Sequence, residues 1–170
     1  MVRFTELKNR NFSVICGDPG GTVVIKNFLN QRKFLPNKMI LSNVSRRILG
    51  KKFIKLEEKN RKKFLSSSNI FITSTSWKSK LELNFISKNI KKQEIRIISF
   101  LDSWFNYKKR FKLKNKYHYP HEIWTFDKYA FQIAKKVFKG KAKIKQERLI
   151  TKDNFFKISS KKNNNILYLT

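Results

Sequence analysis

Residues Ile95–Phe138 give the strongest indication of the fold. The stretch opens with IRIISFLDSWFNYKKRF, runs through a basic connector, and closes with PHEIWTFDKYAFQIAKKVF. Its first part, Ile95–Leu101, is a short apolar run rich in β-branched and aromatic residues, which is typical of a buried parallel strand. A second apolar segment follows at Glu122–Phe126. The stretch therefore predicts a strand, a polar loop, a second strand and a helix.

The helix is predicted to begin after Asp127, whose side chain can accept a hydrogen bond from an unpaired backbone N–H of the first turn. Lys135 and Lys136 stand in the expected last turn, and Gly140 follows just past the end. The apolar positions at helical spacing are Ala130, Ile133, Ala134 and Val137.

Polar and aromatic side chains come directly after the first of these strands. They are Asp102, Trp104, Asn106, Tyr107 and Arg110. In an open α/β sheet, residues just past the carboxyl ends of the strands line the ligand crevice. We therefore expect these side chains to bind a polar, hydroxyl-rich ligand, with Arg110 pairing a phosphate or carboxylate. The structural alternatives are that Asp102 braces its own loop and that Trp104 and Tyr107 pack in the interior.

A glycine-rich turn, GDPGG at residues 17–21, connects a predicted strand at Phe12–Cys16 to a predicted helix at Thr22–Leu29. Because glycine has no Cβ, the backbone N–H groups here can approach a phosphate or sugar at the start of the helix. The glycines concerned are Gly17, Gly20 and Gly21. The turn is neither a dinucleotide fingerprint nor a P-loop, and a plain tight connection explains it equally well.

Other segments complete an α/β pattern. Lys38–Leu41 and Asn69–Thr73 are predicted strands, and Ser42–Leu49 is a predicted helical turn capped by Ser42 or Asn43. Lys51–Lys63 is mostly charged and is expected to face water. We predict an α/β, Rossmann-like fold whose mostly parallel sheet carries helices on both faces.

Hydroxyl groups and an indole follow the strand at Asn69–Thr73. They are Thr73, Ser74, Ser76 and Trp77. The hydroxyls can cap a helix predicted at Ser79–Lys88, or they can donate to sugar hydroxyls or phosphate oxygens. Trp77 can stack on a sugar ring or lie in the core.

Three of these motifs, in this order, resemble bacterial surface-polysaccharide biosynthesis proteins, which are distantly similar to two-lobed (GT-B-like) glycosyltransferases. The first two are GDPGG at residues 17–21 and Thr75-Ser76-Trp77 before Leu81-Glu82. The third is the central stretch, where the matching residues are Asp102, Trp104, Asn106, Tyr107, Arg110, Phe111, Pro120, Glu122, Ile123, Trp124, Asp127, Tyr129 and Ala130. Ser103 stands where the pattern has His.

The resemblance implies an N-terminal lobe that contributes the acceptor-side half of a cleft for a sugar or nucleotide-sugar, without independent activity. Asp102 and Asp18 are the candidates for the base that activates an acceptor hydroxyl. We divide the chain into a lobe at residues 1–140 and a basic linker with a terminal strand at residues 141–170. Ile144–Ile150 and Asn165–Leu169 are strand candidates there. The last is either an edge strand or, by resemblance, the start of a missing second lobe or subunit.

The formal net charge of +29 is the most prominent feature of the composition. Lys, Asn, Ile and Phe are abundant and share A/T-rich codons, so a compositional origin is one explanation. The alternative is a basic nucleic-acid-binding protein, in which the aromatic and basic connector Lys112–Tyr119 would stack on single-stranded bases. Either way, nonspecific binding to polyanions is expected at low salt.

The single cysteine, Cys16, rules out a disulfide framework within the chain, which fits a reducing compartment. No apolar run approaches the roughly 20 residues that a membrane span needs. We expect a cytoplasmic location, or one peripheral to the inner face of the membrane. His118 and His121 lack further ligands at suitable spacing, so neither a metal site nor a cofactor is expected.

Overall fold

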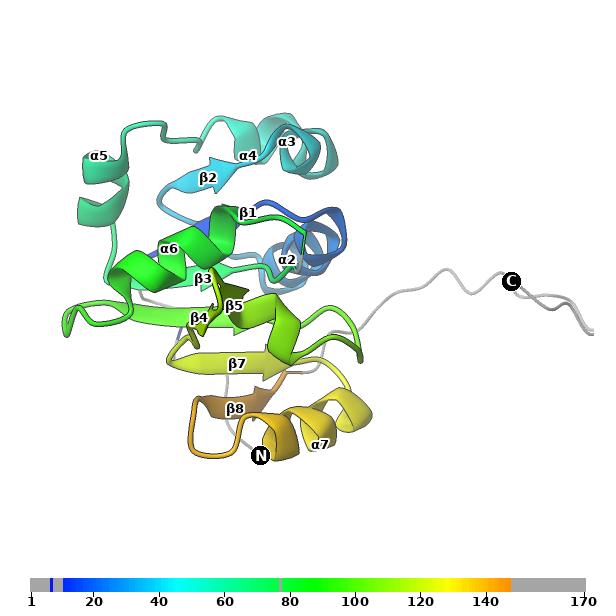
Figure 1. Ribbon diagram of the computed structural model, residues 1–170. Coiled ribbons are helices and arrows are strands. Elements are labelled where there is room, and N and C mark those ends of the chain that lie inside the picture. The colour runs from blue at the N-terminus through cyan, green and yellow to red at the C-terminus, as the bar shows by residue number, and fades with distance from the viewer. Residues whose placement is uncertain (1–6, 8–10, 77, 148–170) are drawn as a thin grey trace, which may run out of the picture.

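The computed structural model describes residue 7, residues 11–76 and residues 78–147. Six strands form one sheet in which every neighbouring pair is parallel, in the order β2-β1-β3-β4-β7-β8 (Figure 1). The strands are β1 (Phe12–Cys16), β2 (Met39–Leu41), β3 (Ile70–Thr73), β4 (Arg96–Phe100), β7 (Glu122–Thr125) and β8 (Lys143–Gln146). This is the predicted Rossmann-like α/β arrangement.

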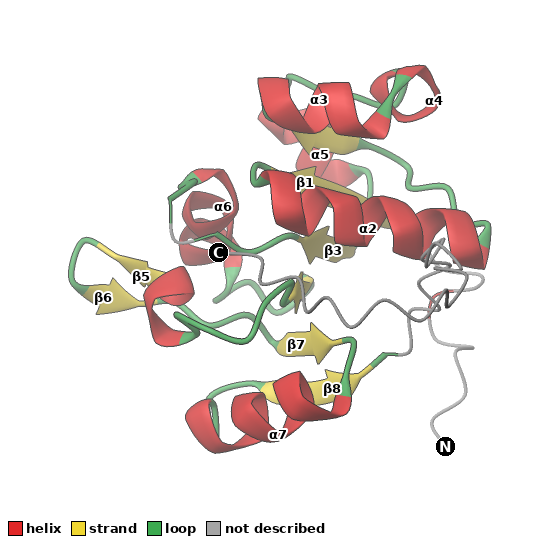
Figure 2. Ribbon diagram, turned by 90° about the vertical axis from the view of Figure 1, so that its right-hand side faces the viewer, coloured by secondary structure: helices red, strands yellow, loops and turns green. Residues whose placement is uncertain are grey.

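Helices lie on both faces of the sheet, as predicted (Figure 2). They are α2 (Pro19–Arg32), α3 (Asn43–Leu49), α4 (Lys51–Ile54), α5 (Arg61–Ser66), α6 (Leu81–Asn89) and α7 (Lys128–Val137). Between β4 and β7 the chain forms a short 3₁₀ helix, η1 (Lys108–Phe111), and a small hairpin of β5 (Lys112–Leu113) and β6 (Lys116–Tyr117). The hairpin lies in the basic connector Lys112–Tyr119, for which no helix or strand was predicted from the sequence.

Side chains alternate between the two faces of the sheet, because successive residues of a strand point in opposite directions. On one face, Val14 and Ile98 pack with the cluster that α2, α3 and α4 cover. On the other face, Ile15 and Ile97 pack with the cluster that α5, α6 and α7 cover. The inner strands β1, β3 and β4 are therefore largely apolar on both faces, which is why their sequences are nearly continuous hydrophobic runs.

The chain reverses its direction across the sheet at β1. From β1 it passes through α2 to β2 at the edge of the sheet, and then crosses back to β3 on the other side of β1. The connections that follow β1 and β3 therefore lead in opposite directions, through α2 on one face of the sheet and α6 on the other. In open α/β sheets, ligands bind at such a switch point.

Local capping determines where the helices begin. Asp18 accepts a hydrogen bond from the Gly21 N–H and Asp127 accepts one from the Ala130 N–H, the second as predicted. Ser42, one of the two predicted alternatives, caps α3. Helix α2 begins earlier than expected, at Pro19, because proline fits the first helical turn and loses no hydrogen bond there.

Three details differ from the sequence predictions. Ile133 is 38% exposed on α7, while Ala130 and Ala134 face the sheet. Helix α6 begins at Leu81 instead of Ser79. The sheet also continues past residue 140, because β8 pairs with β7 and so belongs to the lobe. The rest of Ile144–Ile150 beyond Glu147, and all of Asn165–Leu169, lie outside the described residues.

Replacing Ile97 with Asp should abolish folding. Ile97 is fully buried, and an unpaired charge there costs several kcal/mol, comparable to the roughly 5–15 kcal/mol stability of a whole domain. Ile133→Asp, which introduces the same charge at an exposed position of α7, is the matched control and should fold. Circular dichroism and thermal melting check both variants. A cooperative melt of Ile97→Asp would contradict the buried central strand.

Candidate functional site at the carboxyl edge of the sheet

Three neighbouring strands bring the predicted polar residues to one edge of the sheet. Asp18 follows β1, Ser74 to Ser76 follow β3, and Asp102 follows β4. These strands are adjacent, and their carboxyl ends lie at the right-hand side of the sheet in Figure 1. The edge therefore assembles side chains that are more than 80 positions apart in the sequence.

Arg110 ties two of these strand ends together. Its Nη1 lies 2.5 Å from Oδ1 of Asp102 and also donates to the carbonyl and the hydroxyl of Thr75, at 3.2 and 3.1 Å. Its Nη2 donates to the Ser103 hydroxyl at 3.0 Å. The guanidinium is buried and these bonds are internal, so in this arrangement it braces the loops after β3 and β4. Its expected role in pairing a ligand phosphate stays a prediction.

Asp102 and Asp18 flank Gly20. A Cβ atom added to Gly20 would lie 2.6 Å from Oδ2 of Asp102 and 3.4 Å from Oδ2 of Asp18. Glycine at this position therefore permits the close approach of the Asp102 carboxylate to the start of α2. The two candidate bases of the sequence prediction thus lie on either side of one residue.

The pKa of Asp102 is raised above its ordinary value. Burial is the largest cause, and the nearby Asp18 adds to it, while the Arg110 guanidinium acts in the opposite direction. A carboxyl group whose pKa is raised by burial and a second carboxylate, at the ligand edge of an α/β sheet, has the properties of a general base or acid.

The backbone N–H groups of the glycine-rich turn are bound by a carboxylate of the chain itself. Glu82, in the first turn of α6, accepts hydrogen bonds from the N–H groups of Gly17 and Asp18, at 2.6 and 3.2 Å. It also accepts from the hydroxyls of Ser74 and, at 3.0 Å, Ser79. The Gly17 N–H, which was expected to bind a ligand, is therefore already bonded to a carboxylate of the protein. Its role in ligand binding stays a prediction.

Sequence reasoning did not identify Glu82 as part of this edge. The spacing of Ser79 and Glu82 is that of a capping box, which could have indicated that the glutamate turns back towards the start of its helix. Its contact with Gly17, 65 residues away, had no local indication. Gly17 is needed there, since a Cβ atom would lie 2.7 Å from a Glu82 carboxylate oxygen.

The remaining residues of the turn and of the β3 end are engaged internally. The Gly21 N–H donates to Asp18, and the Thr73 hydroxyl pairs with that of Ser99 at 2.7 Å. Ser76 accepts from the N–H groups of Lys78 and Ser79 at 3.1 and 2.9 Å, in the turn before α6. The predicted capping of the helix itself is wrong, because α6 begins at Leu81 without a side-chain cap. Ligand contacts by Thr73, Ser74, Ser76 and Gly21 stay predictions. Trp77 lies outside the described residues.

The aromatic residues after β4 divide into one exposed and one buried group. Trp104 is 62% exposed, and its indole N–H donates to Asp127 at 2.8 Å. Tyr107 is buried against Phe138, and burial, together with the Asp127 charge, raises its pKa to about 12. Trp104 thus presents a held, accessible ring, whereas Tyr107 packs. Asn106 between them adopts a left-handed conformation with φ of 58°, which asparagine tolerates.

No group of three or more His, Cys, Asp and Glu residues that could hold a metal ion occurs within the described residues. Among the helices of the same part of the chain, none is long and apolar enough to cross a membrane. Comparisons with protein-family models, curated proteins and solved structures found no match.

Replacing Glu82 with Ala should destabilise the fold by roughly 3 kcal/mol, because four donors, one of them buried and three partly buried, would lose their acceptor at once. Urea denaturation followed by circular dichroism measures the change. Glu94→Ala removes the same charge from an exposed loop and should leave the denaturation midpoint nearly unchanged. A Glu82→Ala midpoint equal to that of the control would contradict the bridging role of Glu82.

Asp18→Asn should lower the pKa of Asp102, because it removes a like charge and keeps a good helix cap. Carboxyl ¹³C shifts followed by NMR through a pH titration measure this pKa. Asp127→Asn is the control and should leave it unchanged. In the unaltered protein, the raised pKa of Asp102 stabilises the folded state at low pH. This stabilisation is complete below the unfolded-state pKa of Asp102 and is lost as the pH rises through its folded-state pKa. An Asp102 pKa that is insensitive to Asp18 would contradict the paired carboxylates.

Proposed function

We propose that this domain contributes the acceptor-side half of a glycosyl-transfer site, binding a sugar or nucleotide-sugar at the carboxyl edge of its sheet. The single observation that carries the proposal is the Asp18–Gly20–Asp102 arrangement at the switch point between β1 and β3 and the adjoining end of β4. Asp102 acts as the base towards an acceptor hydroxyl, and burial, together with the charge of Asp18, keeps its pKa raised.

Trp104 supports a carbohydrate ligand in particular. Sugar rings stack on aromatic faces through their C–H surfaces, and an exposed indole beside a carboxylate provides both the apolar face and a hydroxyl acceptor. The bond from its Nε1 to Asp127 holds the ring in place, which reduces the conformational entropy lost on binding.

The distribution of charge favours this proposal over nucleic-acid binding. Exposed lysines occur on elements all around the sheet, as a compositional bias would produce, whereas nucleic-acid-binding proteins gather them on one face or groove. Examples are Lys33 after α2, Lys52 in α4, Lys88 in α6, Lys114 in the hairpin and Lys136 in α7.

A complete glycosyl-transfer site requires a second α/β lobe or subunit facing this edge, because the proposed residues supply an acceptor side without a donor side. The domain alone is therefore expected to bind and not to turn over. A partner that completes the site would add surface against the loops after β3 and β4, which Arg110 already holds rigid.

Titration of the full chain with UDP-glucose, GDP-mannose and free maltose, followed by ¹⁵N NMR at about 0.15 M salt, tests the proposal. We expect shifts of Gly20, Asp102 and the Trp104 indole with at least one probe. Asp102→Asn and Trp104→Ala should each weaken binding about 10-fold, the loss of one charged hydrogen bond or one stacking contact.

Glu94→Gln provides the control, since it removes an exposed carboxylate outside the carboxyl edge. Binding that Asp102→Asn and Trp104→Ala leave unchanged, or the lack of binding of any probe, would refute the proposal. Submicromolar binding of a random-sequence oligonucleotide at the same salt would favour the nucleic-acid alternative.

A further inference from the structure

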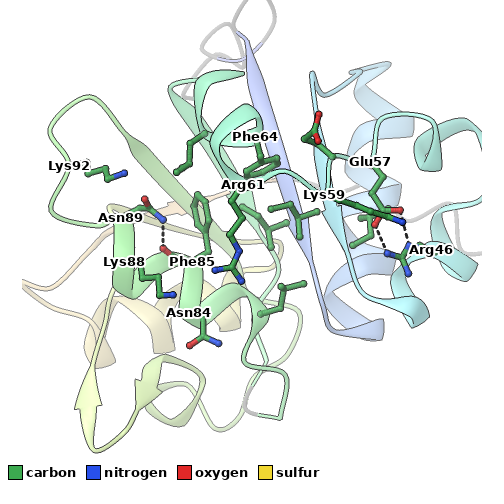
Figure 3. Close-up of a pocket in the computed structure, with 16 residues that line it drawn as sticks. Arg46, Glu57, Lys59, Arg61, Phe64, Asn84, Phe85, Lys88, Asn89 and Lys92 are labelled. Carbon is green, nitrogen blue, oxygen red and sulfur yellow. Dashed lines mark hydrogen bonds and ion pairs between the residues drawn. The ribbon is translucent and has the colours of Figure 1, made fainter.

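A cavity of about 520 Å³ lies on the face of the sheet, separate from the carboxyl-edge residues (Figure 3). Its floor is formed by Ile15 of β1 and Ile40 of β2. Its walls come from α5 on one side and α6 on the other, with the segment around Glu57 at the third side. None of the residues proposed for sugar binding lines it.

The cavity exists because the connection between β2 and β3 does not cover the edge of the sheet. Helix α5 has only six residues, and the segment before it is too rich in charge to supply an apolar covering helix. Ile40 therefore remains partly exposed, although it packs against a buried cluster. The part of the sheet over β1 and β2 thus stays uncovered because Lys51–Lys63 has too few apolar residues to form a long covering helix.

One side of the cavity offers a flat apolar surface. Phe85 of α6 is only partly buried, and its ring is held at fixed angles by Phe64 and Phe71, with ring centroids 5.9 and 5.1 Å away. Leu65 of α5 lines the same space. A ring-shaped ligand body can lie here and remove apolar surface from water.

The lining of the cavity also carries positive charge that the protein does not fully neutralise. Five cationic residues and two glutamates line it. Arg46 is matched by Glu57 through two hydrogen bonds, at 2.8 and 2.5 Å, and this pair lowers the pKa of the glutamate. In the part of the chain that the structure describes, Arg61 and Lys88 have no carboxylate within salt-bridge distance.

Arg61 lies over the middle of the cavity in Figure 3, with Lys88 and Asn84 along the α6 side. A guanidinium can bind two phosphate oxygens at once, and an ammonium adds a further point charge. Placed beside an apolar wall, these groups suit a ligand that has an anionic end and a flat, less polar body.

We propose that this cavity binds a small organic phosphate with a ring-shaped body, of the nucleoside monophosphate class. The phosphate lies against Arg61 and Lys88, and the ring lies against Phe85. The cavity is within the range of about 300–1,000 Å³ that such ligands occupy. The apolar wall distinguishes this site from the general attraction of polyanions to a protein of charge +29, because that attraction needs no ring.

Isothermal titration of the full chain at about 0.15 M salt tests the proposal with four probes: AMP, UMP, inorganic phosphate and octyl phosphate. We expect a nucleotide to bind at least 10-fold more tightly than inorganic phosphate. Arg61→Gln and Lys88→Gln should each weaken nucleotide binding about 10-fold.

Lys62→Gln is the matched control. It removes the same charge from the neighbouring position of α5, which does not line the cavity, and should change affinity less than 2-fold. Equal losses in Arg61→Gln and Lys62→Gln would refute the site, as would inorganic phosphate binding as tightly as the nucleotides. Binding of octyl phosphate alone would refute the ring-shaped ligand. Asp102→Asn should leave nucleotide binding to the cavity unchanged, because Asp102 does not line it. The test of the cavity therefore does not depend on the proposed carbohydrate site.

Discussion

The arrangement of the loops at the carboxyl edge of the sheet depends on the hydrogen bonds that the Glu82 carboxylate accepts. This carboxylate joins the end of β1, the end of β3 and the start of α6 by accepting from two backbone N–H groups and two hydroxyls. Those N–H groups have no other partner in a regular strand or helix, and buried donors without an acceptor are costly. One side chain therefore satisfies the donors of three chain segments at the base of the switch point.

The same principle operates one strand further along the sheet. Arg110 is the donor counterpart of Glu82, because it satisfies the Thr75 carbonyl and the Asp102 carboxylate at once. Both residues bind internal groups that, in the sequence, looked like ligand contacts. Two groups are not used in these bonds: the second oxygen of Asp102, which lies beside Gly20, and the exposed ring of Trp104. These inner bonds fix the loops, so that the outer groups are held in place before a ligand arrives.

The high charge of the chain has a structural consequence as well as an electrostatic one. A lysine-rich connection between β2 and β3 forms the two short helices α4 and α5, since it lacks the apolar stripe of a longer covering helix. The sheet edge beneath stays partly open, and cations of this connection, among them Lys59 and Arg61, line a cavity there together with Lys88 of α6. Composition alone therefore links the basic character of the protein to the presence of a second candidate site.

Local sequence patterns predicted the strands of the sheet, the helix cap at Asp127 and the parallel α/β class, because apolar runs and caps depend on neighbours within a few residues. The cap at Asp18 was found only in the structure. The order of strand ends then predicted that Asp18 and Asp102 would meet at one edge. Which polar groups bond to each other at this edge depends on contacts between distant segments of the chain. Glu82 and Arg110 reach partners 65 and 35 residues away, and the energy of a buried hydrogen bond depends on a geometry that no local pattern contains.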